Sequence, residues 1–118
     1  MKQINNYILE KLRIDKDYFN EEQYYDTLIN AIQKMINKAS ISILGPKDEL
    51  NSNDYTITKE ECGDVNVDMM LVIKFKLYLN GQERYEFGKY ISDELDKIKD
   101  GHKYKVTTVR TINIMIKL

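Results

Sequence analysis

Histidine and cysteine are frequent general bases, nucleophiles and zinc ligands, and this sequence has one of each, His102 and Cys62. A zinc site needs several such ligands, and acid–base catalysis needs a partner within hydrogen-bond reach. No spacing joins either residue to carboxylates in that way. We expect a capping role for His102 after Gly101, and a free thiol for Cys62 in a turn. The sequence therefore predicts no metal site and no catalytic residue.

Other motifs that would indicate an enzyme do not occur. Neither GxGxxG nor GxxxxGK[ST] is present, so nothing supports nucleotide binding by a glycine-rich loop. Acidic side chains gather at Asp15 and Asp17, and again at Glu60, Glu61 and Asp64, in stretches that we interpret as solvated connectors. We expect a protein that is not an enzyme, with no cofactor and no small-molecule substrate.

Two charged residues fall on faces that are otherwise apolar. Glu94 lies in the apolar arc of a predicted helix, between Ile91 and Ile98, and Arg110 interrupts the apolar face of the last predicted strand. A buried charge is tolerated when it is paired. We predict that Glu94 and Arg110 form a structural ion pair between helix and sheet.

A long alternating stretch, Val65 to Leu79, supplies the candidate binding surface. Its odd positions are all apolar, as in a strand with one buried face, and its even positions face away. With the matching side of the last strand, the predicted partner-binding face comprises Met70, Val72, Lys74, Lys76, Tyr78, Lys105, Val109, Met115 and Lys117.

The mixture of apolar and lysine side chains on this face favours contact with a protein, either another protein or a second copy of the chain. The alternative is a nucleic-acid-binding module that uses the same lysines. Only Tyr78 is placed to stack on a base, and the face contains no arginine. We therefore place protein contact first and nucleic acid second.

Periodicity predicts the elements that position this face. Asn20, with Gln23 three residues later, resembles a helix N-cap, and the apolar set that runs from Tyr25 to Ala39 has helical spacing. The expected elements are a helix over Gln3–Leu12, a helix from Asn20 to Ala39, strands over Ser40–Leu44, Asp54–Glu60 and Val65–Leu79, a helix over Gly81–Lys99 and a strand over Lys103–Leu118.

Two connections, at residues 61–63 and at residues 80–81, need to be assigned as a hairpin loop or as the start of a helix. A three-residue hairpin loop, Glu61 to Gly63, would place Ile57 opposite Val67 with both on the buried face. A second hairpin at Asn80–Gly81 would instead bury charges at positions 84 and 86, so we predict a helix over 82–91, with Asn80 and Glu83 as a capping box. Gly88 inside this helix costs about 1 kcal/mol relative to alanine.

Together these elements predict one domain over residues 1–118, in the α+β class. We expect a two-layer α/β sandwich in the order α-α-β-β-β-α-β, with a mixed sheet of about four strands and helices on one face. A right-handed crossover would make the last strand parallel to the central one. The central strand would reach about 50 Å, beyond the ~27 Å of the crossover helix, so its ends would fold over or project.

Composition restricts the class of protein further. Eighteen basic and nineteen acidic residues nearly cancel, which excludes a strongly basic nucleic-acid binder, and one cysteine excludes an internal disulfide. No apolar run is typical of a signal peptide or membrane helix, so we expect a cytoplasmic protein without membrane contact. Abundant Ile, Lys, Asn and Tyr indicate an AT-rich genome, that of a low-GC bacterium or one of its phages.

The order helix, three strands, helix, strand is similar to that of phage tail-terminator and tail-completion proteins, which close rings on a tail tube. Its beginning also resembles the double-stranded RNA-binding domain, although NGQERYEFGKYI lacks the lysine-rich start of that domain's second helix. The first resemblance implies an assembly protein, and an inhibitor of a host protein would use the same kind of surface. The second implies an RNA-binding module.

Overall fold

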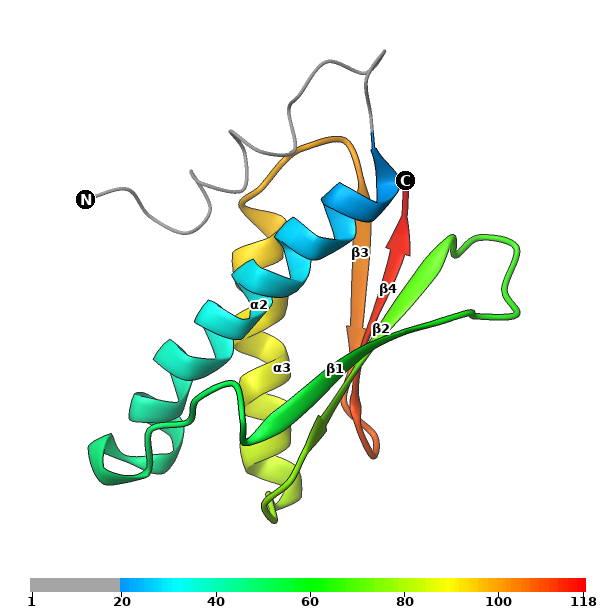
Figure 1. Cartoon of the computed structure of the whole chain (residues 1–118). Helices are drawn as coiled ribbons and strands as arrows, with labels where there is room; N and C mark the ends of the chain where they lie inside the picture. The colour runs from blue at the N-terminus through cyan, green and yellow to red at the C-terminus, as the bar shows by residue number, and fades with distance from the viewer. Residues whose placement is uncertain (1–19) are drawn as a thin grey trace, which may run out of the picture.

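The computed structural model describes residues 20–118 (Figure 1). Two helices cover one face of a four-stranded sheet, which confirms the α+β class and the helices on one face. The predicted helix over Gln3–Leu12 lies outside the described residues. The elements are α2 (Glu21–Leu44), the short helix η2 (Pro46–Asp48), β1 (Tyr55–Glu60), β2 (Met69–Phe75), α3 (Gly81–Asp96), β3 (Lys103–Thr107) and β4 (Ile112–Lys117).

The sheet order is β1-β2-β4-β3, and every neighbouring pair is antiparallel. The predicted mixed sheet with a parallel last strand is therefore wrong. Residues 103–118 form two strands joined by a turn, rather than one long strand. The turn contains Arg110, so the residue that interrupted the apolar alternation marks a chain reversal. That reversal brings β4, rather than β3, beside β2.

The stretch Ser40–Leu44 is the end of α2, and the predicted strand there is wrong. Gly45, with φ 105°, ends the helix in a conformation that side chains avoid. The buried hydroxyl of Ser40 donates to the Asn37 carbonyl at 2.7 Å and accepts from the Leu50 amide at 2.8 Å. Tertiary contacts thus override the strand preference of this short run.

The predicted β1–β2 hairpin forms, with a different register. Ile57 lies opposite Ile73, six residues beyond the predicted Val67, and Tyr55 lies opposite Phe75, so residues 61–68 form the connection. Because the shift is even, odd-numbered side chains still face the core. Ring contacts hold this register: Phe75 lies 5.9 Å from Tyr55 and 5.1 Å from Phe87, measured between ring centroids. The β1–β2 connection projects beyond the helical layer (Figure 1).

The helix predicted after Asn80 is confirmed, as is its capping box. The Asn80 side chain accepts from the Glu83 amide at 2.8 Å, and the Glu83 carboxylate accepts from the Asn80 amide at 3.0 Å. The helix ends at Asp96, three residues before the predicted Lys99. Packing explains why glycine is accommodated at position 88 inside a helix, because a Cβ there would collide with the Thr108 methyl group.

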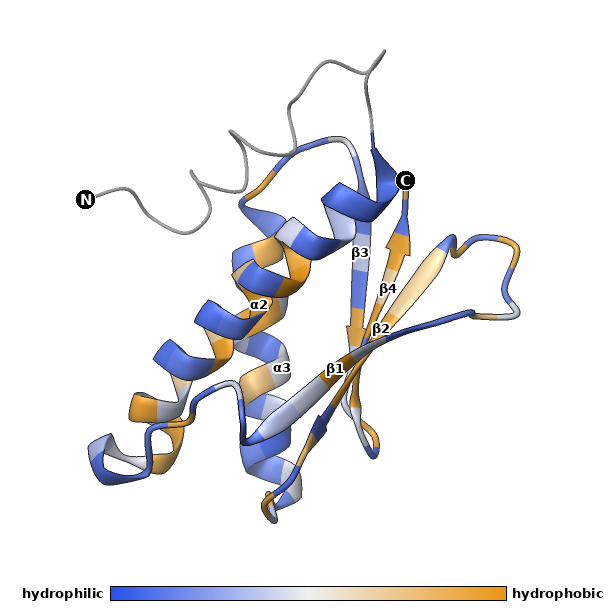
Figure 2. Ribbon diagram, in the orientation of Figure 1, coloured by the Kyte–Doolittle hydropathy of each residue, from blue (hydrophilic) through white to orange (hydrophobic). Residues whose placement is uncertain are grey.

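The core lies between the two helices and the sheet. The residues of α2 and α3 that belong to the core are mainly apolar, and polar positions of both helices alternate with them along the ribbon (Figure 2). On the sheet side the fully buried residues are Leu71, Ile73, Ile112, Ile114 and Ile116. Among residues 20–118, no helix has both the length and the apolar character that crossing a membrane requires.

Candidate functional site

The sheet face opposite the helices, here called the open face, is the candidate site. Each strand contributes alternate side chains to it: Thr56, Thr58 and Glu60 from β1; Met70, Val72 and Lys74 from β2; Asn113, Met115 and Lys117 from β4; and Lys103, Lys105 and Thr107 from β3. The strand registers arrange these residues in rows across the sheet, so the face is positioned by backbone hydrogen bonds alone.

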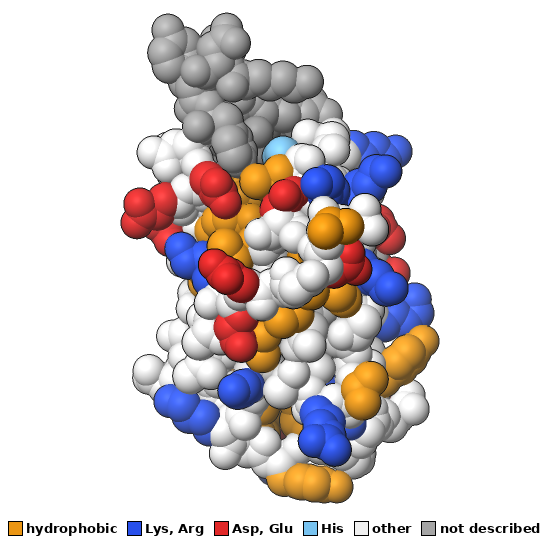
Figure 3. Space-filling view, turned by 90° about the vertical axis from the view of Figure 1, so that its right-hand side faces the viewer, with side chains coloured by type: hydrophobic (Ala, Val, Ile, Leu, Met, Phe, Trp, Pro, Cys, Tyr) orange, Lys and Arg blue, Asp and Glu red, His pale blue; other side chains and the backbone are white. Residues whose placement is uncertain are grey.

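An apolar strip runs along the middle of the open face. Met70 and Met115 lie directly opposite each other, and Val72 adjoins Met70 along β2. Val72 is only 4% exposed although it points away from the helices, because its neighbours on the face cover it. Figure 3, which views this side of the molecule, shows apolar side chains interspersed with acidic and basic groups on both sides.

A pocket of about 500 Å³ lies at one end of the open face, between the β1–β2 connection and strands β3 and β4. We call it the lysine pocket. It is lined by Asp64, Asn66, Val67, Lys103, Tyr104, Lys105, Met115, Ile116 and Lys117. Its loop wall is ordered by Asp64, whose carboxylate accepts from the Asn66 amide at 2.8 Å and whose carbonyl accepts from the Val67 amide at 3.0 Å.

The charges of the lysine pocket are only partly balanced. Lys117 lies 3.5 Å from Asp68, and the Leu118 amide, which donates to Asp68 at 2.8 Å, holds the pKa of that carboxyl below its usual range. Lys103 lies directly opposite Lys117, and neither Lys103 nor Lys105 has an ion pair or side-chain hydrogen bond within residues 20–118. The pocket therefore presents free positive charge suited to an anion.

Only part of the predicted partner-binding face lies on the open face. Met70, Val72, Lys74, Lys105, Met115 and Lys117 belong to it. Lys76 and Tyr78 follow the end of β2, and Val109 lies in the β3–β4 turn; Tyr78 is 86% and Val109 80% exposed. The prediction omitted Lys103, although its two-residue spacing from Lys105 indicates the same face.

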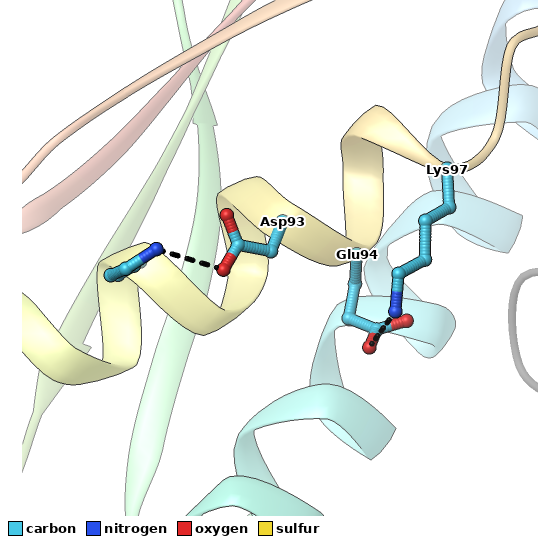
Figure 4. A network of polar contacts seen from close by, with 4 residues as sticks. Asp93, Glu94 and Lys97 are labelled. Carbon is cyan, nitrogen blue, oxygen red and sulfur yellow. Dashed lines mark hydrogen bonds and ion pairs between the residues drawn. The ribbon is translucent and has the colours of Figure 1, made fainter.

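The predicted buried ion pair does not form. Glu94 lies 3.2 Å from Lys97 of its own helical turn (Figure 4), and Arg110 is exposed in the β3–β4 turn. The arginine that joins helix and turn is Arg84, which donates to the Thr108 carbonyl at 3.0 Å and to the Val109 carbonyl at 2.9 Å. The prediction placed Arg110 on the apolar face of a strand because it treated residues 103–118 as one strand. This stretch forms two strands, and Arg110 lies in the turn between them.

A buried hydroxyl network that sequence reasoning missed joins α2 to β3. Tyr104 donates to Asp100 at 2.8 Å, so its oxygen accepts the hydrogen of Tyr24 at 2.6 Å. Burial raises the pKa of both tyrosines far above their usual range, and the Tyr24 hydroxyl adds to the rise at Tyr104. The ring of His102 lies 4.9 Å from that of Tyr24. Both hydroxyls therefore stay protonated, which suits a structural connection.

A second, more open pocket, of about 410 Å³, lies where α2 begins and β1 ends, lined by Glu21, Glu22, Tyr25, Lys59, Glu60, Glu61 and Met69. The Lys59 ammonium lies 5.8 Å from the centroid of the Tyr25 ring. Burial raises the pKa of Tyr25 to about 12, with Glu21 and Asp68 contributing. This pocket already holds its own cation, and its tyrosine is protonated at neutral pH.

Within residues 20–118, no three His, Cys, Asp or Glu side chains are grouped so that they could hold a metal ion. Cys62 is a half-buried free thiol in the β1–β2 connection. Among residues 20–118, the open face and its lysine pocket are the candidate binding surfaces. The chain matches no protein-family model, no curated protein and no solved structure.

Proposed function

We propose that this protein is a non-catalytic binding protein and that the open face is its contact surface for a partner protein. One observation carries the proposal: a sheet face that no helix of residues 20–118 covers combines an apolar strip with lysines, of which Lys103 and Lys105 have no ion pair within the same residues. An antiparallel sheet can leave one face in water, but that face is then usually polar. Apolar centres with polar rims are typical of protein interfaces.

The charge of the open face favours an acidic partner over a second copy. Its lysines are Lys74, Lys103, Lys105 and Lys117, and Glu60 is its only acid among the described residues. A two-fold contact through this face would place the same basic patch on both sides. Like charges across an interface disfavour association, whereas an acidic surface is complementary. An inhibitor or assembly factor that acts on a different protein fits this surface best.

Nucleic acid is the second candidate, supported by the same lysines. Single-stranded nucleic acids bind to aromatic platforms as well as to positive charge. No aromatic side chain lies on the open face among residues 20–118, because Tyr78 follows the end of β2.

Capture from cells of the source organism tests the proposal. The tagged full chain should retain a specific protein, and Lys74→Glu and Met115→Glu should each reduce retention at least tenfold. Lys38→Glu, a charge reversal at an exposed position of α2, is the matched control and should change nothing. Circular dichroism establishes that each variant is folded.

Three results would contradict the proposal. Retention that is unaffected by both open-face variants would remove this face as the interface. Association into a dimer or ring that Met115→Glu abolishes would show a second copy as the occupant. Oligonucleotide binding that falls steeply with salt and is lost in Lys74→Glu would favour the nucleic-acid alternative.

A further inference from the structure

The outer edge of β3 is a sheet edge with no partner strand among residues 20–118. β3 is the last strand of the described sheet and pairs there with β4, through residues Lys103 to Thr107. Outside that ladder, no backbone hydrogen bond of β3 occurs within the described part of the chain. Such an edge can accept another extended segment, because its free N–H and C=O groups already have the spacing of a strand.

Lysines mark this edge. Lys103 and Lys105 project on the same side, about 6.6 Å apart at ~3.3 Å per residue. Like charges directly opposite each other destabilise a sheet, and Lys103 faces Lys117 in this way. An acidic side chain on the outer side of β3 would relieve that repulsion. A strand added there would place its alternate side chains beside Lys103 and Lys105.

The other side of the same edge offers a second recess. Between α3 and β3 lies a pocket of about 260 Å³, lined by Tyr85, Gly88, Lys89, Ser92, Asp93, Val106 and Thr108. Val106 alternates with Lys105, so this recess lies on the helix side of β3, behind the open face. Side chains of an added strand that alternate with its acidic ones would point towards it.

We propose that β3 binds an extended acidic segment of the partner as a fifth strand, with Asp or Glu at alternate positions facing Lys103 and Lys105 and small residues towards the recess. This inference rests on the proposed function only in taking the partner to be a protein. The lysine pocket receives the acidic side chain nearest Lys103. Backbone hydrogen bonds supply affinity, and the alternating charge supplies specificity.

The opposite edge of the sheet is chemically different. β1 contributes Thr56, Thr58 and Glu60 to the open face, and its one lysine, Lys59, lies on the other side, near the Tyr25 ring. On the open face, an acidic segment therefore has no charge partner at this edge and is repelled at Glu60. Edge lysines also oppose self-pairing, since two copies of β3 would bring lysine to lysine. The same charges therefore exclude a second copy and admit an acidic strand.

Nuclear magnetic resonance titration of the full chain with three probes tests this. The first probe is a capped seven-residue peptide of alternating glutamate and valine, the second has the same composition with its glutamates contiguous, and the third is an oligothymidylate. We expect the first to shift the amide signals of residues 103–107 and to bind at least tenfold more tightly than the second. Lys105→Glu should weaken it at least tenfold, and Lys38→Glu should not.

Equal affinity for the two peptides, or no shift at β3 with millimolar peptide, would overturn the inference. Tighter binding of oligothymidylate at the same lysines would also overturn it and identify a nucleic-acid site. Lys103→Glu serves as a second variant if Lys105→Glu does not fold. The two proposals can fail separately. Lys74→Glu changes the open face without changing β3, so it tests the proposed function, whereas Lys105→Glu changes β3 itself and tests the added strand.

Discussion

Tyr24 donates its hydroxyl hydrogen to Tyr104 at 2.6 Å, across eighty positions of the chain. Tyr104 passes its own hydrogen to Asp100, so the three residues form one directed chain from α2 through β3 to the α3–β3 connection. The middle residue of these hydrogen bonds, Tyr104, belongs to β3, the strand that also carries Lys103 and Lys105. It therefore stabilises the position of the edge to which we assign partner binding.

Removing the middle hydroxyl should destabilise the fold. In Tyr104→Phe, both the Tyr24 hydroxyl and the Asp100 carboxylate lose a partner in a poorly solvated place. We expect the free energy of unfolding in urea to fall by about 1–3 kcal/mol. Tyr78→Phe, at a position that is 86% exposed, is the control and should leave it unchanged. Equal stability of Tyr104→Phe and Tyr78→Phe would show that the hydroxyl network does not contribute to the free energy of unfolding.

Stability should depend on alkaline pH. Burial raises the pKa of Tyr25 and of Tyr55 from the usual 10.0 to about 12, and raises those of Tyr24 and Tyr104 further. The native state thus holds these protons more tightly than the unfolded chain, so the stabilisation is complete below pH 10 and is lost as pH rises through 10 to 12. Urea midpoints measured from pH 8 to 11.5 should stay level and then fall.

The matched control for this pH dependence is Tyr55→Phe. It removes one of the tyrosines whose pKa is raised, so the decline above pH 10 should become shallower than in the wild type. A midpoint that falls equally in both proteins would assign the decline to other groups.

Gly88→Ala should destabilise the protein despite the better helix propensity of alanine. The added methyl group meets the Cγ2 of Thr108 where α3 packs against the β3–β4 turn, and overpacking of this kind typically costs about 1–3 kcal/mol. Thr108→Ser removes that Cγ2. The double variant should therefore recover most of the loss, and urea denaturation of the four proteins measures the coupling. Simple additivity of the two changes would exclude this contact as the cause.

The two arginines near the β3–β4 turn should respond differently to truncation. Arg84→Ala loses two hydrogen bonds to turn carbonyls, and we expect a loss of about 1–3 kcal/mol in the free energy of unfolding. Arg110→Ala, at an exposed position, should change it by less than about 0.5 kcal/mol. A larger loss of unfolding free energy in Arg110→Ala would contradict this expectation and support a buried, paired charge at Arg110.

Features set by neighbouring residues could be predicted from the sequence. The capping box of Asn80 and Glu83 depends on contacts three residues apart, and the core face of α2 depends on helical spacing. The helix at 81–96 was predicted because a hairpin would have buried charges. That reasoning needs only the two-residue period of a strand, which is a local property.

Within the strands that form, sequence alone therefore determined which positions face the core and which face away, since alternation assigns faces without knowledge of strand partners. It did not determine where the strands end, so Lys76, Tyr78 and Val109 were assigned to a face that they do not share. Only the tertiary structure decided the Tyr55–Phe75 register, the separation of β3 from β4 and the helical state of Ser40. Each of these depends on contacts between distant residues, where packing outweighs local preference. The free edge of β3 and its lysine pocket belong to this second group, because strand order, rather than strand pattern, makes an edge.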